Sequence, residues 1–153
     1  MHVLKLKIPP PVVALFMGVL MWLAARATPT CAFMMPARRI LAACLALAGL
    51  STAILGVVSF RRAGTTVNPM QPEKATSLVT SGIYRVTRNP MYVGLLLALT
   101  AWAVFLANAL GFLFLPALVL YLNRFQIAPE EVALARVFGQ QFIDYKSRVR
   151  RWV

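Results

Sequence analysis

Four long apolar stretches, nearly free of charged residues, constrain how this chain can fold. They run over about residues 11–25, 40–60, 90–106 and 110–125. Segments of this length and hydropathy are typical of helices that cross a bilayer. Inside lipid, backbone N–H and C=O groups must be bonded within their own segment, which favours α-helices. The sequence therefore predicts an all-α integral membrane protein with about four transmembrane helices and a C-terminal amphipathic helix.

The composition agrees with a membrane protein and excludes two other classes. The chain is 60% hydrophobic and 13% charged, whereas a soluble domain carries roughly a quarter charged residues. The net charge of +12 suggests nucleic acid, but the basic residues alternate with apolar stretches and form no single polar face, so we expect no nucleic-acid partner. His2 is the only histidine, and Cys31 and Cys44 lack metal-ligand spacing, so we expect no metal site.

The first apolar stretch has an alternative interpretation as a secretory signal peptide. Lys5 and Lys7 would form its basic region, and Ala25-Arg26-Ala27 would form its cleavage site. We favour a transmembrane helix, which tilt or local bilayer thinning can accommodate despite its short length.

The loops predict an orientation in the membrane. Asn108 leaves room for only a tight turn between the third and fourth segments, so these two form an antiparallel hairpin. Four crossings place both termini and the long loop of residues 61–89 on one side. Of the 16 lysines and arginines, only Arg26, Arg38 and Arg39 fall on the other side. The positive-inside rule makes the basic side cytoplasmic, at the inner membrane if the protein is bacterial, with both termini in the cytoplasm.

Two further patterns predict how the helices pack. Gly49 and Gly56 lie on nearly one face of the second segment and permit close helix approach. Pro129 is expected to restart a helix after the fourth segment. Apolar residues then recur at helical spacing through Val149, which predicts one amphipathic helix on the inner leaflet or over the bundle.

The residues before the third segment suggest an anion site. Asn89 is suited to cap the helix and Pro90 to occupy its first position. Free N–H groups and a partial positive charge at a helix N-terminus, reinforced by Arg88, would hold a carboxylate. Tyr92 can share the face of Arg88, and Gly94 leaves room for a ligand. The alternative is simply the start of a transmembrane helix flanked by interfacial residues.

A second constellation follows the fourth segment. Glu130 and Glu131 are two of only four acidic residues. They suit the first turn of a helix after Pro129, but carboxylates beside a bilayer are costly without a partner. A cationic ligand group would supply one, and Arg124 is another candidate. The hairpin brings both constellations to the same face, where they match the carboxylate, ammonium and hydroxyl groups of S-adenosylmethionine.

These motifs resemble the isoprenylcysteine carboxyl methyltransferase family, which is related to phospholipid N-methyltransferases. The family pattern is Gly-x-Tyr, Arg-His-Pro-x-Tyr-x-Gly, an apolar hairpin, an Arg, an acidic pair and a Phe-Gly-x-x-Phe/Tyr-x-x-Tyr tail. Here it reads Gly82-Ile83-Tyr84, Arg88-Asn89-Pro90-Met91-Tyr92-Val93-Gly94, Arg124, Glu130-Glu131 and Phe138-Gly139-Gln140-Gln141-Phe142-Ile143-Asp144-Tyr145. The resemblance covers about residues 78–149, and the histidine of the motif is Asn89, which cannot titrate near neutral pH.

The resemblance implies a single methyltransferase domain over residues 1–153. Residues 1–62 would hold the first two transmembrane helices, and residues 78–149 the catalytic core with its hairpin and C-terminal cap. The implied catalytic residues are Arg124, to orient the acceptor, and the pair Glu130 and Glu131, either of which can take a proton from it. The implied cofactor-binding residues are Tyr84, Arg88, Asn89, Pro90, Tyr92, Gly94, Glu130, Leu134, Phe138 and Tyr145.

Together these observations predict an S-adenosylmethionine-dependent methyltransferase that acts on a lipid-like or prenylated acceptor at the cytoplasmic membrane face. An isoprenylcysteine-type carboxylate leads, with a phospholipid amine or a thiol as alternative acceptors. The alternative from another class is a small non-catalytic membrane assembly or sensor protein. A channel or transporter is disfavoured, because the apolar segments carry no paired polar groups at mid-depth.

Overall fold

A computed structural model describes residues 8–64 and 75–153 of the chain. Within them the fold is all helical apart from an isolated bridge between Ala32 and Asn108. The helices are α1 (Pro10–Ala27), η1 (Pro29–Cys31), α2 (Arg38–Arg62), η3 (Gly82–Arg85), α3 (Pro90–Leu106), η4 (Ala109–Leu113), α4 (Phe114–Leu122), η5 (Asn123–Ile127), α5 (Ala128–Phe138) and α6 (Gln140–Arg148). The predicted fold class is therefore confirmed.

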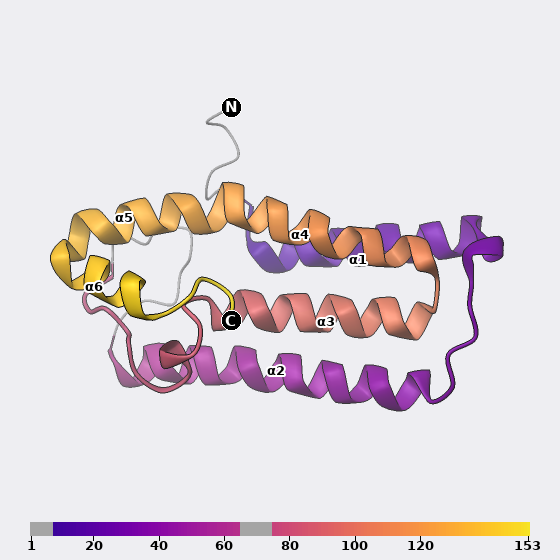
Figure 1. The fold of residues 1–153 in the computed structure, drawn as a ribbon, viewed down its shortest axis with the longest axis horizontal. Coiled ribbons are helices and arrows are strands. Elements are labelled where there is room, and N and C mark those ends of the chain that lie inside the picture. Colours follow the sequence, from indigo (N-terminus) through magenta and orange to yellow (C-terminus); the bar gives the residue numbers. More distant parts are fainter. Residues whose placement is uncertain (1–7, 65–74) are drawn as a thin grey trace.

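The long helices have the dimensions of membrane spans. α1, α2 and the continuous helical segment Ala109–Phe138 are each long and apolar enough to cross a bilayer. α3 has 17 residues, so it is about 25 Å long, and it lies beside the others in the bundle (Figure 1). The protein is an integral membrane protein whose four apolar helices run side by side.

α3 lies at the centre of this bundle, with α2 on one side and α1 and α4 on the other (Figure 1). Gly49 of α2 faces Gly94 of α3 so closely that a Cβ on Gly94 would lie 2.7 Å from the carbonyl oxygen of Gly49. Gly56 packs in the same way on Pro90 and Met91. The predicted close approach along the glycines of the second segment is confirmed.

The turn between α3 and α4 is held by Asn108, which is buried. Ala107 adopts the left-handed conformation (φ 48°) that ends α3. The Asn108 side chain accepts a hydrogen bond from the Leu110 N–H (3.0 Å) and donates one to the carbonyl oxygen of Thr28 (2.9 Å). These bonds fix the predicted antiparallel hairpin and tie it to the chain that follows α1.

Two boundary predictions were wrong. The fourth helix does not stop at Phe125, and Pro129 does not restart a helix, because the helix continues through the π-turn η5 into α5. A proline inside a helix lacks an N–H and collides with the carbonyl four residues earlier. The wider π-turn relieves this: the Ala128 N–H bonds the carbonyl of Asn123, five residues before it.

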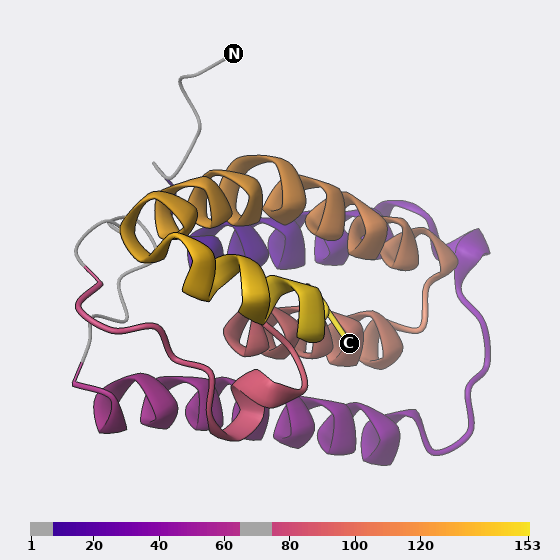
Figure 2. The same cartoon turned by 60° about the vertical axis from the view of Figure 1, so that its left-hand side comes forward.

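The predicted single amphipathic helix is in fact two helices. Gly139 has φ 53° and ψ −127°, a combination that L-residues with a side chain rarely adopt. It ends α5 and turns the chain so that α6 runs back across the end of the bundle (Figure 2). The start of α1, the chain before α3 and the α5–α6 pair thus share one end, as four crossings require. His2, Lys5, Lys7 and Lys74 lie outside the described residues.

Candidate ligand-binding site at the end of the helix bundle

A pocket lies at the end of the bundle where α6 crosses in front of the start of α3 (Figure 2). Its walls come from the end of α2, from the chain leading into α3, and from η5, α5 and α6. The lining residues are Phe60, Ala75, Ser77, Leu78, Val79, Tyr84, Arg88, Asn89, Met91, Tyr92, Ile127, Glu130, Glu131, Leu134, Phe142 and Tyr145. Segments far apart in sequence therefore meet here, as the predicted hairpin requires.

Glu130 and Tyr92 join α5 to α3 inside this pocket. The buried hydroxyl of Tyr92 donates a hydrogen bond to Oε2 of Glu130 at 3.0 Å. Tyr92 lies in the first turn of α3 because Pro90 begins that helix. Glu130 lies in the first turn of α5. The two constellations found in the sequence are thus in direct contact.

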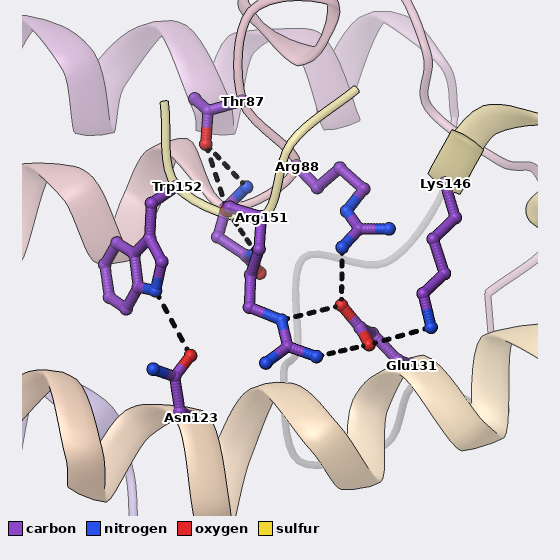
Figure 3. Close-up of polar contacts among 8 residues, drawn as sticks. Thr87, Arg88, Asn123, Glu131, Lys146, Arg151 and Trp152 are labelled. Carbon is purple, nitrogen blue, oxygen red and sulfur yellow. Dashed lines mark hydrogen bonds and ion pairs between the residues drawn. The ribbon is translucent and has the colours of Figure 1, made fainter. Parts of the chain in front are cut away.

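Glu131 is enclosed by three cationic side chains (Figure 3). Its carboxylate bonds Nη2 of Arg88 at 2.9 Å and Nη2 of Arg151 at 2.7 Å, and Lys146 Nζ lies 3.4 Å away. Nε of Arg151 donates a further bond at 3.0 Å. These contacts neutralise the charge of Glu131. The adjacent glutamates therefore differ in their partners: Glu131 binds three cations, whereas Glu130 makes a side-chain hydrogen bond only to Tyr92 among the described residues.

Arg88 is a buried cation with spare donors. Its side chain is 9% exposed, and burial lowers its pKa, partly opposed by Glu131. Only Nη2 has a partner, while Nε and Nη1 are buried without a hydrogen-bond partner among the described residues. Buried polar groups are nearly always bonded, and unsatisfied charged donors are costly. An anionic ligand group in this pocket would satisfy both.

Asn89 does not cap α3 with its side chain, contrary to the prediction. Its Nδ2 donates instead to the backbone carbonyl of Arg151 at 2.8 Å. The sequence pattern could not show this, because the partner lies beyond α6 near the end of the chain. Asn89, which stands where the resembled family has histidine, therefore serves as an attachment point for the residues after α6.

The opposite wall of the pocket is aromatic. The Tyr145 hydroxyl of α6 donates to the backbone carbonyl of Tyr84 at 2.7 Å, and Phe60 packs edge-on against Tyr84 with ring centroids 5.3 Å apart. Burial raises the pKa of Tyr145 to about 12 and that of Tyr84 still further. Both rings are neutral at physiological pH and, with Phe142 and Leu134, offer flat apolar surface.

Four residues singled out from the sequence lie outside the pocket lining, and one of them, Pro90, begins α3 between the lining residues Asn89 and Met91. Gly94 faces Gly49 and Ala53 of α2, so it permits helix packing and leaves no space for a ligand. Phe138 packs under the aromatic wall. Arg124 is an exposed residue of η5, and the ion-pair partners of Glu131 within the described residues are other cations.

Sequence reasoning missed Lys146, Arg151 and Trp152. Trp152 donates from Nε1 to Oδ1 of Asn123 at 3.1 Å. Arg151 and Trp152 follow the last motif residue and read as an ordinary basic, interfacial flank. Only the position of α6, set by the backbone at Gly139, brings Lys146 and Arg151 to Glu131 and Trp152 to Asn123, beside the pocket.

The fold and the pocket define a class: a helical membrane protein with a pocket at one end of its bundle that arginine and glutamate side chains line. The model of the phospholipid methyltransferase family matches residues 37–141. The chain belongs to this family.

The chain spans about half the length, or less, of the two named methyltransferases that it matches, and the whole length of a third, shorter relative. The chain is 35% identical over 112 residues to protein-S-isoprenylcysteine O-methyltransferase of Rattus norvegicus, covering 69% of this chain and 39% of that protein. It is 30% identical over 108 residues to protein-S-isoprenylcysteine O-methyltransferase B of Arabidopsis thaliana, covering 66% of this chain and 55% of that one. An uncharacterised Haemophilus influenzae protein is 46% identical over 63 residues, which are 41% of this chain and the whole of that protein.

Proposed function

We propose that the protein is an S-adenosylmethionine-dependent methyltransferase that methylates a lipid-like acceptor in this pocket. The observation that carries the proposal is the pairing of opposite charges at one site. Within the described residues, Arg88 offers two buried donor nitrogens without a partner, and Glu130 offers a carboxylate held by a single neutral hydrogen bond. A ligand with a carboxylate beside an ammonium fits both, and the family match and the relatives named for methyl transfer support the same assignment.

We assign the cofactor contacts from the pocket lining. Arg88 would hold the cofactor carboxylate through a charge-assisted bond. Glu130 would accept from its ammonium or a ribose hydroxyl, with Tyr92 fixing the carboxylate in place. Tyr84, Leu134 and Tyr145 would face the adenine. Asn89 and Pro90 would contribute by shaping the start of α3.

The bound cofactor would supply an electrophilic methyl group, and the chain has to align a nucleophile with it and exclude water. A carboxylate acceptor is a nucleophile without proton loss. An amine or thiol must lose a proton, and Glu130 is the carboxylate placed to accept it. Glu131 is unsuited to this step because three cations hold its charge. Arg124 lies outside the pocket lining and is assigned no contact there.

A lipidic acceptor suits the position of the pocket. Met91 and Ile127 line it at the level where α3 and η5 enter the apolar bundle, so a hydrocarbon chain in the membrane can approach the site from the side. The relatives act, by name, on isoprenylcysteine, and the family is named for phospholipids. The basic residues gathered at this end support a site, and both termini, at the cytoplasmic face, which would be that of the inner membrane if the protein is bacterial.

Incubation of membranes with methyl-labelled S-adenosylmethionine tests this function. We expect label in the lipid or prenylated fraction for the wild type, and loss of label for Arg88→Gln and Glu130→Gln. Gln140→Ala is the matched control, because it changes an exposed side chain of α6 bonded only to Asp144 among the described residues. Absence of label in every fraction would contradict the proposal and favour a non-catalytic membrane protein.

A further inference from the structure

The residues after α6 fold back over the start of α3 (Figure 3). The backbone N–H of Arg88 donates to the backbone carbonyl of Arg150 at 3.0 Å. The carbonyl of Arg151 accepts from Asn89 Nδ2 at 2.8 Å and from the Thr87 hydroxyl at 3.3 Å. Trp152 anchors the far end to Asn123. Residues 150–152, called here the C-terminal strap, thus bond each residue of the segment 87–89.

The Arg151 side chain makes the closest ion pair at the site. It holds both oxygens of Glu131, with Nη2 2.7 Å from Oε2 and Nε 3.0 Å from Oε1. Such a two-bond fork is the strongest arrangement of guanidinium and carboxylate. The hydrogen bond to Glu131 raises the pKa of Arg151, so the fork is present at any physiological pH.

This fork determines which nitrogens of Arg88 bond Glu131. Because Arg151 bonds both oxygens of Glu131, Arg88 reaches that carboxylate through Nη2 alone, and its Nε and Nη1 have no partner in the part of the chain that the structure describes. In the absence of Arg151, Glu131 could form the two-bond fork with Arg88, which would engage a second guanidinium nitrogen besides Nη2. Glu131 would then compete with a ligand carboxylate for the same guanidinium.

We propose that Arg151 is a positioning residue, which occupies Glu131 and, through the C-terminal strap, holds Arg88 with two donors available to the carboxylate of the ligand. This inference rests on the proposed function, since it assigns Arg88 to the cofactor carboxylate. Arg151 itself does not line the pocket, so it acts through Arg88.

Two ligands that differ in their amino-acid end separate positioning from mere stability. S-adenosylhomocysteine carries the amino-acid carboxylate and ammonium, and 5′-methylthioadenosine has the same nucleoside and thioether without either group. For the purified full chain in detergent, we expect Arg151→Ala to weaken the dissociation constant for S-adenosylhomocysteine by about tenfold or more, the scale of one charge-assisted hydrogen bond. Binding of methylthioadenosine should change less than about twofold, which is under half a kcal/mol.

Two further variants complete the design. Arg151→Lys keeps the charge without the fork and should recover part of the affinity. Arg150→Ala removes an exposed neighbouring cation while keeping the backbone carbonyl that bonds Arg88, and it should match the wild type. If Arg151→Ala does not fold, Arg151→Lys and Arg151→Gln carry the comparison.

The outcomes distinguish the two proposals. Wild-type binding of S-adenosylhomocysteine with unchanged affinity in the Arg151 variants would overturn the positioning role and leave the proposed function standing. Equal weakening of the binding of both ligands would show that Arg151 only stabilises the fold, and would also overturn the positioning role. A wild type that binds neither ligand would overturn the proposed function and this inference together.

Discussion

Arg88 and Glu131 are 43 residues apart in the chain, yet Nη2 of the first lies 2.9 Å from Oε1 of the second. Arg88 comes just before α3 and Glu131 is in the first turn of α5. The contact exists because the turn at Asn108 folds α4 back along α3. The hairpin therefore brings a cation and a carboxylate of the site together, although they lie on different helical segments.

Glu131→Gln should destabilise the protein by about 3 kcal/mol, because it leaves the buried Arg88 guanidinium without its counterion. Thermal unfolding in detergent measures this. Asp144→Asn is the matched control: it removes an exposed acidic side chain on α6 and should stay within about 0.5 kcal/mol of the wild type. Equal effects of the two substitutions would show that the ion cluster does not hold the site together.

Gly94→Val should separate α3 from α2. Even a Cβ at this position would meet the Gly49 carbonyl oxygen at 2.7 Å, and backbone cannot yield as a flexible side chain does. We expect a loss of about 2–4 kcal/mol or failure to fold. Gly18→Ala is the control, since its Cβ would lie 3.9 Å from Leu99 and Trp102. Normal melting of Gly94→Val would refute the close packing of α2 on α3.

Gly139→Ala should disturb the site without a steric clash. Among the described residues beyond its chain neighbours, no atom lies within 4 Å of a Cβ built there, so the cost comes from the backbone conformation, about 1–3 kcal/mol. Hydrogen exchange of α6 should rise, because the turn that carries it over the pocket is weakened. Gly111→Ala is the control, because among the described residues its Cβ would meet the Met21 side chain at an ordinary 3.8 Å, so the hydrogen exchange of α6 should not change. Faster exchange of α6 in both variants would show that the backbone conformation of Gly139 does not hold α6 over the pocket.

Asn108→Ala should weaken the opposite end of the bundle by about 2 kcal/mol, since it leaves the Leu110 N–H without its acceptor and removes one of the bonds to the Thr28 carbonyl, which keeps the Cys31 N–H. Asn108→Asp keeps the acceptor for Leu110 but puts a buried carboxylate oxygen against the Thr28 carbonyl oxygen, so it should melt well below the wild type. Should the alanine variant melt like the wild type, the turn would not depend on this side chain.

The fold was largely predictable because its main features are local or forced. The apolar lengths gave α1 to α4, and the two residues Ala107 and Asn108 leave no alternative to a hairpin. Gly49 and Gly94 pack as small residues in membrane helices do. The continuity of α4 into α5 was not predictable, because a π-turn at residues 123–127 absorbs Pro129, and that turn has no sequence signature.

The site was predictable only in part, because some of its residues are brought together by the hairpin and others by backbone geometry that leaves no pattern in the sequence. Arg88, Tyr92, Glu130 and Glu131 come together because they flank the hairpin. Lys146 and Arg151 reach Glu131 only through the direction of α6, which depends on an unusual backbone angle at Gly139. Gly94 was placed in the pocket because a small residue can admit either a ligand or a helix, and the sequence does not distinguish the two.

Titration of purified wild-type protein with S-adenosylhomocysteine, followed by calorimetry, is the most direct test that Arg88 and Glu130 form a cofactor site. We expect saturable binding at one site per chain, strongly weakened by Arg88→Gln and by Glu130→Gln while both variants remain folded. Absence of binding at millimolar ligand, or undiminished binding by both variants, would contradict this assignment.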